Sequence, residues 1–144
     1  MIVMDSLTRK CWTTPLKDKR GSNVLQKFKK MWRKIGNFKR FMSDAGSEFV
    51  SKDFQKALED RNVQYVRGNP HAPHVERLNR TIQNFLFKAM YQRRKENWTN
   101  LLDDIGLAYI NRKHRIIKMS PNEAEKSKTY SELIKNVTLF YEKA

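Results

Sequence analysis

Cysteine is nearly absent from the sequence. Cys11 is its single example, and the histidines at positions 71, 74 and 114 have no pair of cysteines among them. A disulfide framework needs two cysteines and a Cys/His zinc module needs four ligands, so both classes are excluded. This thiol content fits a reducing compartment inside the cell.

Long hydrophobic runs are also lacking. No stretch reaches the roughly 18 apolar residues that a membrane-spanning helix needs. The apolar residues at positions 1–4 are followed too soon by charge to form the core of a signal peptide. We therefore expect neither a membrane partner nor secretion.

Acidic residues are scarce relative to basic ones. The 144 residues include 30 Lys and Arg against 15 Asp and Glu, which gives a formal net charge of +15. A surface of this charge attracts polyanions, so nucleic acid is the first partner to consider. Ribosomal, membrane-surface and RNA-binding proteins share such a charge, so motifs must decide among them. The length corresponds to one domain.

Strand patterns occur early in the chain and helical periodicity late. Short apolar stretches bounded by turn residues predict strands at 1–5 and 11–16, as a hairpin or as one strand passing into the next, and further strands at 38–42 and 63–66. Apolar residues spaced by three and four predict helices in five ranges, 22–36, 51–61, 75–94, 98–111 and 130–141. The expectation is one α/β domain with a helical C-terminal half.

Large aromatic side chains fall on or near these apolar stripes. Trp32, Phe85, Phe87 and Trp98 are therefore expected in the core rather than as platforms for stacked bases. Trp12 fits neither role clearly.

Two acidic residues stand where a catalytic pair is needed. Asp44 follows the strand predicted at 38–42, and Glu76 lies in the first turn of the helix predicted at 75–94. A divalent cation such as Mg²⁺ binds carboxylate oxygens on rigid elements and keeps positions open for water and phosphate. The residues alone leave a structural alternative open, with Asp44 as a turn former and Glu76 as a complement to the helix dipole.

The segments around these residues resemble a known family. Residues 43–49, Ser-Asp-Ala-Gly-Ser-Glu-Phe, and residues 74–81, His-Val-Glu-Arg-Leu-Asn-Arg-Thr, resemble the two signature segments of the catalytic core of DDE integrases. Three further segments, 2–10, 108–114 and 119–124, resemble the family's second strand, its closing helix and its Ser-Pro-X-Glu-Ala turn. The resemblance covers about residues 1–125 and points to retroviral, retrotransposon and Maverick/Polinton integrases.

The resemblance implies a ribonuclease H-like fold, in which helices flank a mixed sheet and two Asp and one Glu hold two Mg²⁺ or Mn²⁺ ions. Asp44 is similar to the family's second Asp and Glu76 to its Glu, so both are expected to be catalytic metal ligands. The family's first Asp lies one strand before the strand that residues 2–10 resemble. We therefore expect the first strand to be missing, before Met1.

Asp5 is the alternative third metal ligand. Its context resembles the second strand, where the family often has a non-catalytic Asp. A structural role is preferred, in which Asp5 forms turn hydrogen bonds with Ser6 and Thr8.

Three residues near the two signature carboxylates are expected to meet DNA. Glu48 resembles a family position near target DNA, and Arg77 and Arg80 follow Glu76 on the same predicted helix. For the arginines, a solvated helix face with an Arg80–Glu76 pair is an equal alternative.

A dense basic run lies on the helix predicted at 22–36. Its Lys30, Arg33 and Lys34 are expected to contact phosphates, which require little geometric precision. The alternative is the solvated side of an amphipathic helix.

The expected function is DNA integration, that is, metal-dependent DNA end processing and strand transfer by a mobile-element integrase. Residues 1–125 are expected as the catalytic core and 126–144 as a helical extension. Two carboxylates carry too little charge for two dications, so this fragment alone is expected to be inactive. The alternative is a degenerate transposon-derived DNA-binding protein without catalysis. Expected partners are element ends, target DNA and further copies of the chain, in the nucleus.

Overall fold

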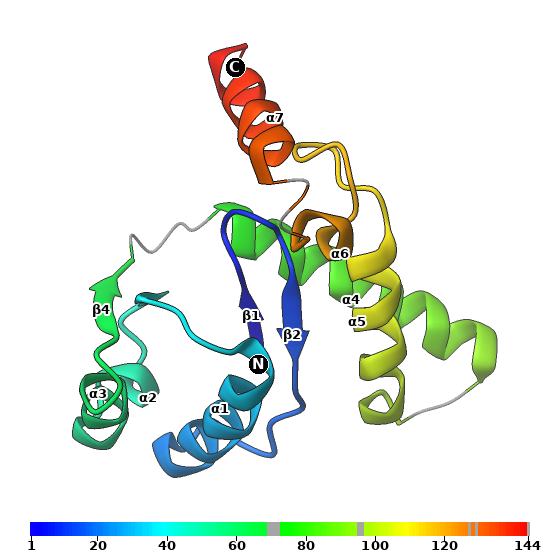
Figure 1. Ribbon diagram of the computed structural model, residues 1–144. Coiled ribbons are helices and arrows are strands. Elements are labelled where there is room, and N and C mark those ends of the chain that lie inside the picture. The colour runs from blue at the N-terminus through cyan, green and yellow to red at the C-terminus, as the bar shows by residue number, and fades with distance from the viewer. Residues whose placement is uncertain (69–72, 95–96, 127, 129, 144) are drawn as a thin grey trace. The chain divides into compact units, whose positions relative to one another are not determined.

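The computed structural model describes residues 1–68, 73–94, 97–126, 128 and 130–143 (Figure 1). The chain divides into two compact units. Unit 1 comprises Met1 and Thr14–Arg77, and unit 2 comprises Ile2–Thr13 and Leu78–Ala144. Each unit contains one two-stranded sheet with helices around it.

Unit 1 alternates helices and strands. Its elements are α1 (Gly21–Ile35), β3 (Arg40–Ser43), α2 (Ser47–Val50), α3 (Lys52–Glu59) and β4 (Gln64–Arg67). Strands β3 and β4 are parallel, with Arg40 opposite Gln64 and Ser43 opposite Arg67. Helices α2 and α3 form the crossover between the two strands, as a parallel pair requires.

Aromatic rings form the core of unit 1. Phe28 of α1 and Phe54 of α3 are fully buried, and their ring centroids lie 5.0 Å apart. Phe41 of β3 lies 4.9 Å from Phe28 and 6.4 Å from Tyr65, its register partner on β4. These contacts fix α1 and α3 on the β3–β4 pair, because close-packed rings tolerate little displacement.

Unit 2 begins with a hairpin. Strand β1 (Ile2–Met4) pairs antiparallel with β2 (Cys11–Thr13), with Ile2 opposite Thr13 and Met4 opposite Cys11. The turn is closed by the Asp5 N–H donating to the Lys10 carbonyl at 2.8 Å and the Arg9 N–H donating to the Asp5 carbonyl at 2.9 Å. Of the two arrangements predicted for residues 1–16, the hairpin is the one formed.

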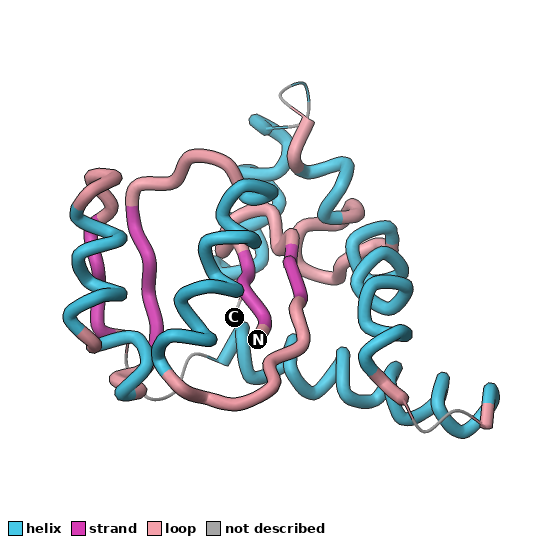
Figure 2. Tube along the Cα trace, turned by 90° about the horizontal axis from the view of Figure 1, so that it is seen from below, coloured by secondary structure: helices cyan, strands magenta, loops and turns pink. Residues whose placement is uncertain are grey.

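The rest of unit 2 is mainly helical, and Figure 2 shows the helices of the chain in cyan. The helices are α4 (Pro73–Arg93), whose residues up to Arg77 belong to unit 1, η1 (Thr99–Leu101), α5 (Leu102–Asn111), α6 (Pro121–Ala124) and α7 (Tyr130–Glu142). One apolar cluster joins α4, α5 and the hairpin through Leu78, Ile105 and Cys11. A second joins α6 and α7 through Ala124 and Leu133, together with Ile117.

The predicted α/β organisation, with strands early and helices late, is confirmed. The helix predicted from residue 98 begins as the 3₁₀ turn η1, and α2 and α6 were not predicted, because four residues are too few to show a period. The expected burial of Trp32 is confirmed, at 5% exposure, whereas that of Phe87 and Trp98 is wrong, since their side chains are 66% and 38% exposed. In the described part of the chain, no helix has the length and hydropathy needed to span a bilayer.

Candidate active site

Asp44 stands immediately after the C-terminal end of β3. The N–H of Gly68, the first residue after β4, donates to the carbonyl of Ser43 at 2.8 Å, so the two parallel strands stay joined to this point. Sites in open α/β sheets form at the carboxyl ends of the strands. The Asp44 side chain is exposed at this end of the pair.

Two hydroxyl groups fix the main chain of Asp44. Its carbonyl accepts hydrogen bonds from the Ser43 hydroxyl at 2.8 Å and from the Tyr65 hydroxyl at 3.2 Å. The two hydroxyls lie 3.1 Å apart. Among the described residues, no hydrogen bond or ion pair engages the Asp44 carboxylate. The backbone is therefore anchored while the carboxylate is available to a ligand.

The turn after Asp44 brings in a second carboxylate. Glu48 is in the first turn of α2, is half-buried, and folds back over Gly46. A Cβ at position 46 would stand 2.7 Å from the Oε2 atom of Glu48. Because residue 46 is a glycine, this space is open to the side chain of Glu48. Glu48 follows Asp44 by four residues in the sequence.

Glu76 lies in the first turn of α4 and is exposed. The helix starts at Pro73, a residue suited to the first helical position because it has no N–H to satisfy. The positive end of the helix dipole favours a carboxylate here. Asp44 and Glu76 both belong to unit 1. Most of the β4–α4 loop, residues 69–72 with His71, lies outside the described residues.

The signature segments contain three carboxylates among the described residues, Asp44, Glu48 and Glu76, of which Asp44 and Glu76 are the predicted metal ligands. No group of three or more His, Cys, Asp or Glu side chains converges in a metal-binding arrangement anywhere in the described ranges. A carboxylate pair is a hard oxygen donor set, which suits Mg²⁺ or Mn²⁺ better than softer metals.

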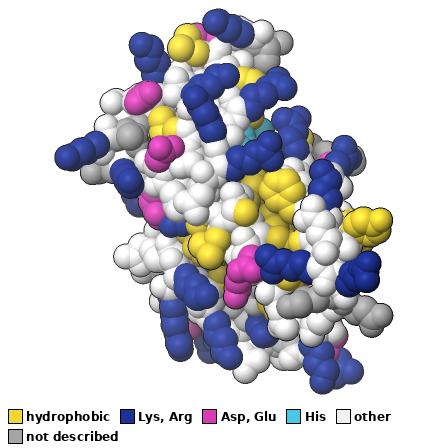
Figure 3. Space-filling model, turned by 90° about the vertical axis from the view of Figure 1, so that its right-hand side faces the viewer, with side chains coloured by type: hydrophobic (Ala, Val, Ile, Leu, Met, Phe, Trp, Pro, Cys, Tyr) yellow, Lys and Arg dark blue, Asp and Glu magenta, His cyan; other side chains and the backbone are white. Residues whose placement is uncertain are grey.

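Basic side chains predicted to contact DNA are on the surface. Lys30, Arg33 and Lys34 of α1 are exposed, and α1 contains no acidic residue. Arg77 and Arg80 of α4 are exposed as well. On the face drawn in Figure 3, Lys and Arg side chains are much more widespread than carboxylates, and hydrophobic side chains reach the surface between them. Exposure at these positions is compatible with both phosphate contact and a solvated helix face.

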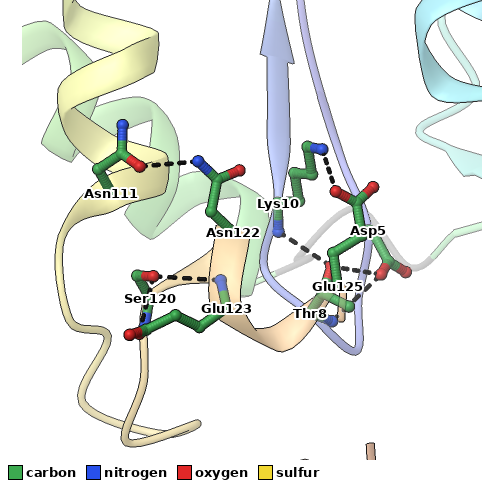
Figure 4. A network of polar contacts seen from close by, with 8 residues as sticks. All are labelled: Asp5, Thr8, Lys10, Asn111, Ser120, Asn122, Glu123 and Glu125. Atoms are coloured by element: carbon green, nitrogen blue, oxygen red, sulfur yellow. Dashed lines mark hydrogen bonds and ion pairs between the residues drawn. The ribbon is translucent and has the colours of Figure 1, made fainter. Parts of the chain in front are cut away.

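Asp5 serves the hairpin turn of unit 2. Its Oδ2 atom accepts hydrogen bonds from the N–H of Thr8 at 3.1 Å and from the Thr8 hydroxyl at 2.5 Å, and Oδ1 accepts from the N–H of Leu7 at 3.4 Å. In the close view of Figure 4, the neighbouring Lys10 forms an ion pair with Glu125. Asp5 therefore makes turn hydrogen bonds of the kind expected for a structural role. They involve Thr8, as predicted, and Leu7 in place of Ser6.

The sequence prediction missed Tyr65 and Ser43 as supports of the site. Ser43 directly precedes Asp44, and a hydroxyl beside a candidate ligand is a recognisable signal. Tyr65 is 21 residues away, and only the parallel register of β3 and β4 brings its hydroxyl to the Asp44 carbonyl.

Comparison with known proteins assigns the family. The model of the integrase core domain matches residues 1–73, about half of the chain, including Asp44 and ending before Glu76. The Pro-Pol polyprotein of feline foamy virus is 28% identical over 127 residues, which cover 85% of this chain and 11% of the polyprotein. The Pol-related polyprotein of mouse intracisternal A-particle MIA14 is 26% identical over 91 residues, 60% of this chain and 10% of the polyprotein. The chain spans about a tenth of the length of these relatives.

A solved structure confirms the fold. The catalytic core domain of HTLV-2 integrase, determined with magnesium in a trimeric form, is similar with a TM-score of 0.78 over 87% of this chain and 82% of that one, at 15% identity. The class defined by the fold is therefore the ribonuclease H-like α/β core of integrases. The chain belongs to the integrase core domain family.

Proposed function

We propose that the chain contributes to DNA integration as the catalytic core of a mobile-element integrase, through metal-dependent DNA end processing and strand transfer. The observation that carries the proposal is Asp44: an exposed carboxylate on an anchored backbone, at the end of a parallel strand, inside the segment matched by the integrase core. Family membership supports the reaction class.

The donor set fits a hard divalent cation. Asp44 and Glu76 would hold it through their carboxylate oxygens, because Mg²⁺ prefers a few carboxylates and open positions for water and phosphate. When bound, the cation supplies Lewis-acid activation of a water or DNA hydroxyl for attack on a phosphodiester. The chain's own task is to keep Asp44 in place through Ser43 and Tyr65. Two carboxylates do not balance two dications, so we infer that this chain by itself holds at most one ion and is inactive or very weak.

The exposed cations supply the DNA contacts in this proposal. Lys30, Arg33 and Lys34 would neutralise backbone phosphates along α1, and Arg77 and Arg80 would do so beside Glu76. Glu48 would face target DNA next to Asp44. The DNA substrates would be element ends and target duplex.

One observation favours a second function. The described ranges contain no convergent group of three metal-ligating side chains, as expected for a degenerate element protein that binds DNA without catalysis. Such a protein would bind duplex DNA equally well with and without Mn²⁺.

Further copies of the chain and a nuclear location complete the proposal. The HTLV-2 core was determined as a trimer, and a simian T-cell lymphotropic virus intasome has a similar chain. The chain would act as a multimer on two DNA ends, in the nucleus, where the proposed target DNA lies.

Metal binding by the chain itself tests the proposal. Titrating Mn²⁺ and following the electron paramagnetic resonance signal of the free ion should give saturable binding. Asp44→Asn and Glu76→Gln should each weaken Mn²⁺ binding at least about tenfold. Loss of a residue that only supports a metal ligand already weakens metal binding by about this factor. Asp53→Asn removes another exposed carboxylate of unit 1 and should leave binding unchanged.

A DNA assay separates the two functions. Labelled duplex should be nicked with Mn²⁺ in a form of the protein that supplies a third carboxylate, and Asp44→Asn should abolish nicking. Equal Mn²⁺ affinity of wild type and Asp44→Asn would reject the ligand assignment. Metal-independent duplex binding in all variants would then favour the non-catalytic protein.

A further inference from the structure

Helix α4 has two faces of opposite chemistry. Leu78 and Ile82 are buried in the first apolar cluster of unit 2, with Phe85, Leu86 and Met90 packed against it. The opposite side carries a set of exposed residues that we call the α4 stripe: Arg80, Asn84, Phe87, Lys88 and Tyr91. Because helix neighbours on one face recur every three or four residues, these five side chains lie on one narrow band.

Two aromatic rings are unusually open on this stripe. Phe87 is 66% exposed and Tyr91 is 88% exposed. They are four residues apart, slightly more than one helical turn and about 6 Å along the axis. Single exposed hydrophobic residues are ordinary on protein surfaces. Phe87 and Tyr91 lie on successive turns of α4 and face away from the core that this helix covers. Packing in the core therefore does not explain the aromatic pair.

The charge around these rings has one sign. Residues 77–94 contain five Lys and Arg and no Asp or Glu. Arg93 is paired with Asp104 of α5, at 3.4 Å. Within the described part of the chain, no ion pair engages Arg80 or Lys88. The stripe therefore presents two cations with the aromatic pair.

This combination selects among partners. A second copy of the chain docked on this stripe would bring its own cations against these, at a net charge of +15 each, so self-association through this surface is opposed. Duplex DNA attracts the cations, but its bases are stacked and offer no open face to a ring. Unpaired bases do offer that face, and single-strand binding sites combine cations along the backbone with aromatic platforms for bases.

We propose that the α4 stripe binds single-stranded nucleic acid. Phe87 and Tyr91 stack on unpaired bases, and Arg80 and Lys88 contact the phosphates on either side of them. Asn84 adds a side-chain amide that can hydrogen bond to a base edge. This site shares Arg80 with the DNA contacts proposed above, adds single-stranded nucleic acid as a ligand, and does not depend on metal binding at Asp44.

The test compares three fluorescent ligands of equal length by anisotropy, with EDTA present: an oligothymidine, an abasic oligonucleotide with the same phosphates, and a duplex. Wild type should bind the oligothymidine more tightly than the abasic strand. Phe87→Ala and Tyr91→Ala should each weaken oligothymidine binding at least about fivefold, the lower end for loss of one base–aromatic stack. Both variants should bind the abasic strand as wild type does.

Control variants keep the result interpretable. Tyr130→Ala removes a 50% exposed tyrosine from α7 and should change none of the affinities. The double variant Phe87→Trp, Tyr91→Trp should retain oligothymidine binding, because Trp preserves a stacking surface. Unchanged oligothymidine affinity in the alanine variants, or an equal loss on the abasic strand, overturns the proposal. Dissociation of a wild-type oligomer by Phe87→Ala in sedimentation velocity, without a change in oligothymidine affinity, overturns it in favour of a protein interface.

Discussion

The hydroxyl of Tyr65 donates a hydrogen bond to the main-chain carbonyl of Asp44 at 3.2 Å. This contact connects the middle of β4 to the residue that follows β3. The Ser43 hydroxyl reaches the same carbonyl at 2.8 Å, so one acceptor serves two donors. The orientation of the Asp44 carboxylate consequently depends on a residue far away in sequence.

Removing one donor should weaken unit 1 only modestly. We expect Tyr65→Phe to lower the free energy of unfolding by about 0.5–1.5 kcal/mol, because the carbonyl keeps the Ser43 hydroxyl as its partner. Urea denaturation of Tyr65→Phe, Ser43→Ala and the double variant gives a coupling free energy. The double variant should lose more than the sum of the single changes, since only it leaves the carbonyl with neither donor. If the losses of unfolding free energy in the single variants add up to the loss in the double variant, the two hydroxyls stabilise unit 1 independently.

The same variants separate positioning from ligation. If Asp44 binds a metal ion as proposed, Tyr65→Phe should weaken Mn²⁺ binding less than Asp44→Asn does, because it leaves the carboxylate present but less fixed. The measurement is the Mn²⁺ titration described above, with Tyr130→Phe as the matched control on an exposed tyrosine. A Tyr65→Phe variant with wild-type Mn²⁺ affinity would limit Tyr65 to a structural role.

Local signals in the sequence were sufficient for the elements. The apolar spacing of Val24, Phe28 and Met31 predicts α1, and all three are buried. Short apolar stretches around Phe41 and Tyr65 predict β3 and β4, and the turn residues after the first of them predict Asp44 at a strand end, where the structure has it. Periodicity and turn residues are properties of short segments, so they can be read without tertiary information.

Long-range features could not be predicted in this way. The strand pairing that brings Tyr65 to Asp44 depends on tertiary packing, and no pattern near residue 65 indicates it. Phe87 follows an apolar spacing yet lies on the outward side of α4, because Leu86 and Met90 complete the core face instead. When a helix has apolar residues on two of its sides, the sequence alone does not show which side faces the core.

Arg9 is a buried cation whose side chain has one hydrogen-bond acceptor in the part of the chain that the structure describes, the neutral hydroxyl of Tyr141. It is 4% exposed, has a positive φ of 62°, and donates from Nη2 to the Tyr141 hydroxyl at 3.2 Å. Its Nε has no hydrogen-bond partner among the described residues. Tyr141→Phe should cost about 1.5–3 kcal/mol of unfolding free energy, because a hydrogen bond to a charged group is lost. Tyr130→Phe on the same helix should cost close to nothing in the same urea titration, and equal costs would contradict the assignment.

Cys11 should be inert in the folded protein. It is 5% exposed, and burial raises the pKa of its thiol to about 12. The reactive thiolate is therefore on the order of a thousandfold less abundant at pH 8 than for a free cysteine. Labelling with iodoacetamide, followed by mass spectrometry, should be slow in buffer and fast in urea. Rapid native labelling would show that β2 opens readily.

The capping box of α6 should make part of the stability of unit 2 depend on pH. The Ser120 hydroxyl accepts from the Glu123 N–H at 3.2 Å, and the Glu123 carboxylate accepts from the Ser120 N–H at 2.8 Å. The Ser120 N–H and hydroxyl hold the pKa of Glu123 below its ordinary value of 4.5. Because the folded pKa is the lower one, this stabilisation is complete above pH 4.5 and is lost as pH falls through the folded pKa.

Two variants test the capping box. Ser120→Ala should lower unfolding free energy by about 0.5–2 kcal/mol at pH 7, the cost of losing an N-cap. Glu123→Gln keeps a side-chain acceptor but removes the titrating charge, so its urea midpoint should vary less with pH than that of the wild type between pH 6 and 3. The two proteins should therefore differ most at pH 6 and converge at pH 3. If the urea midpoints of the two proteins differ by the same amount across this pH range, the charge of Glu123 does not stabilise unit 2 through its hydrogen bonds with Ser120.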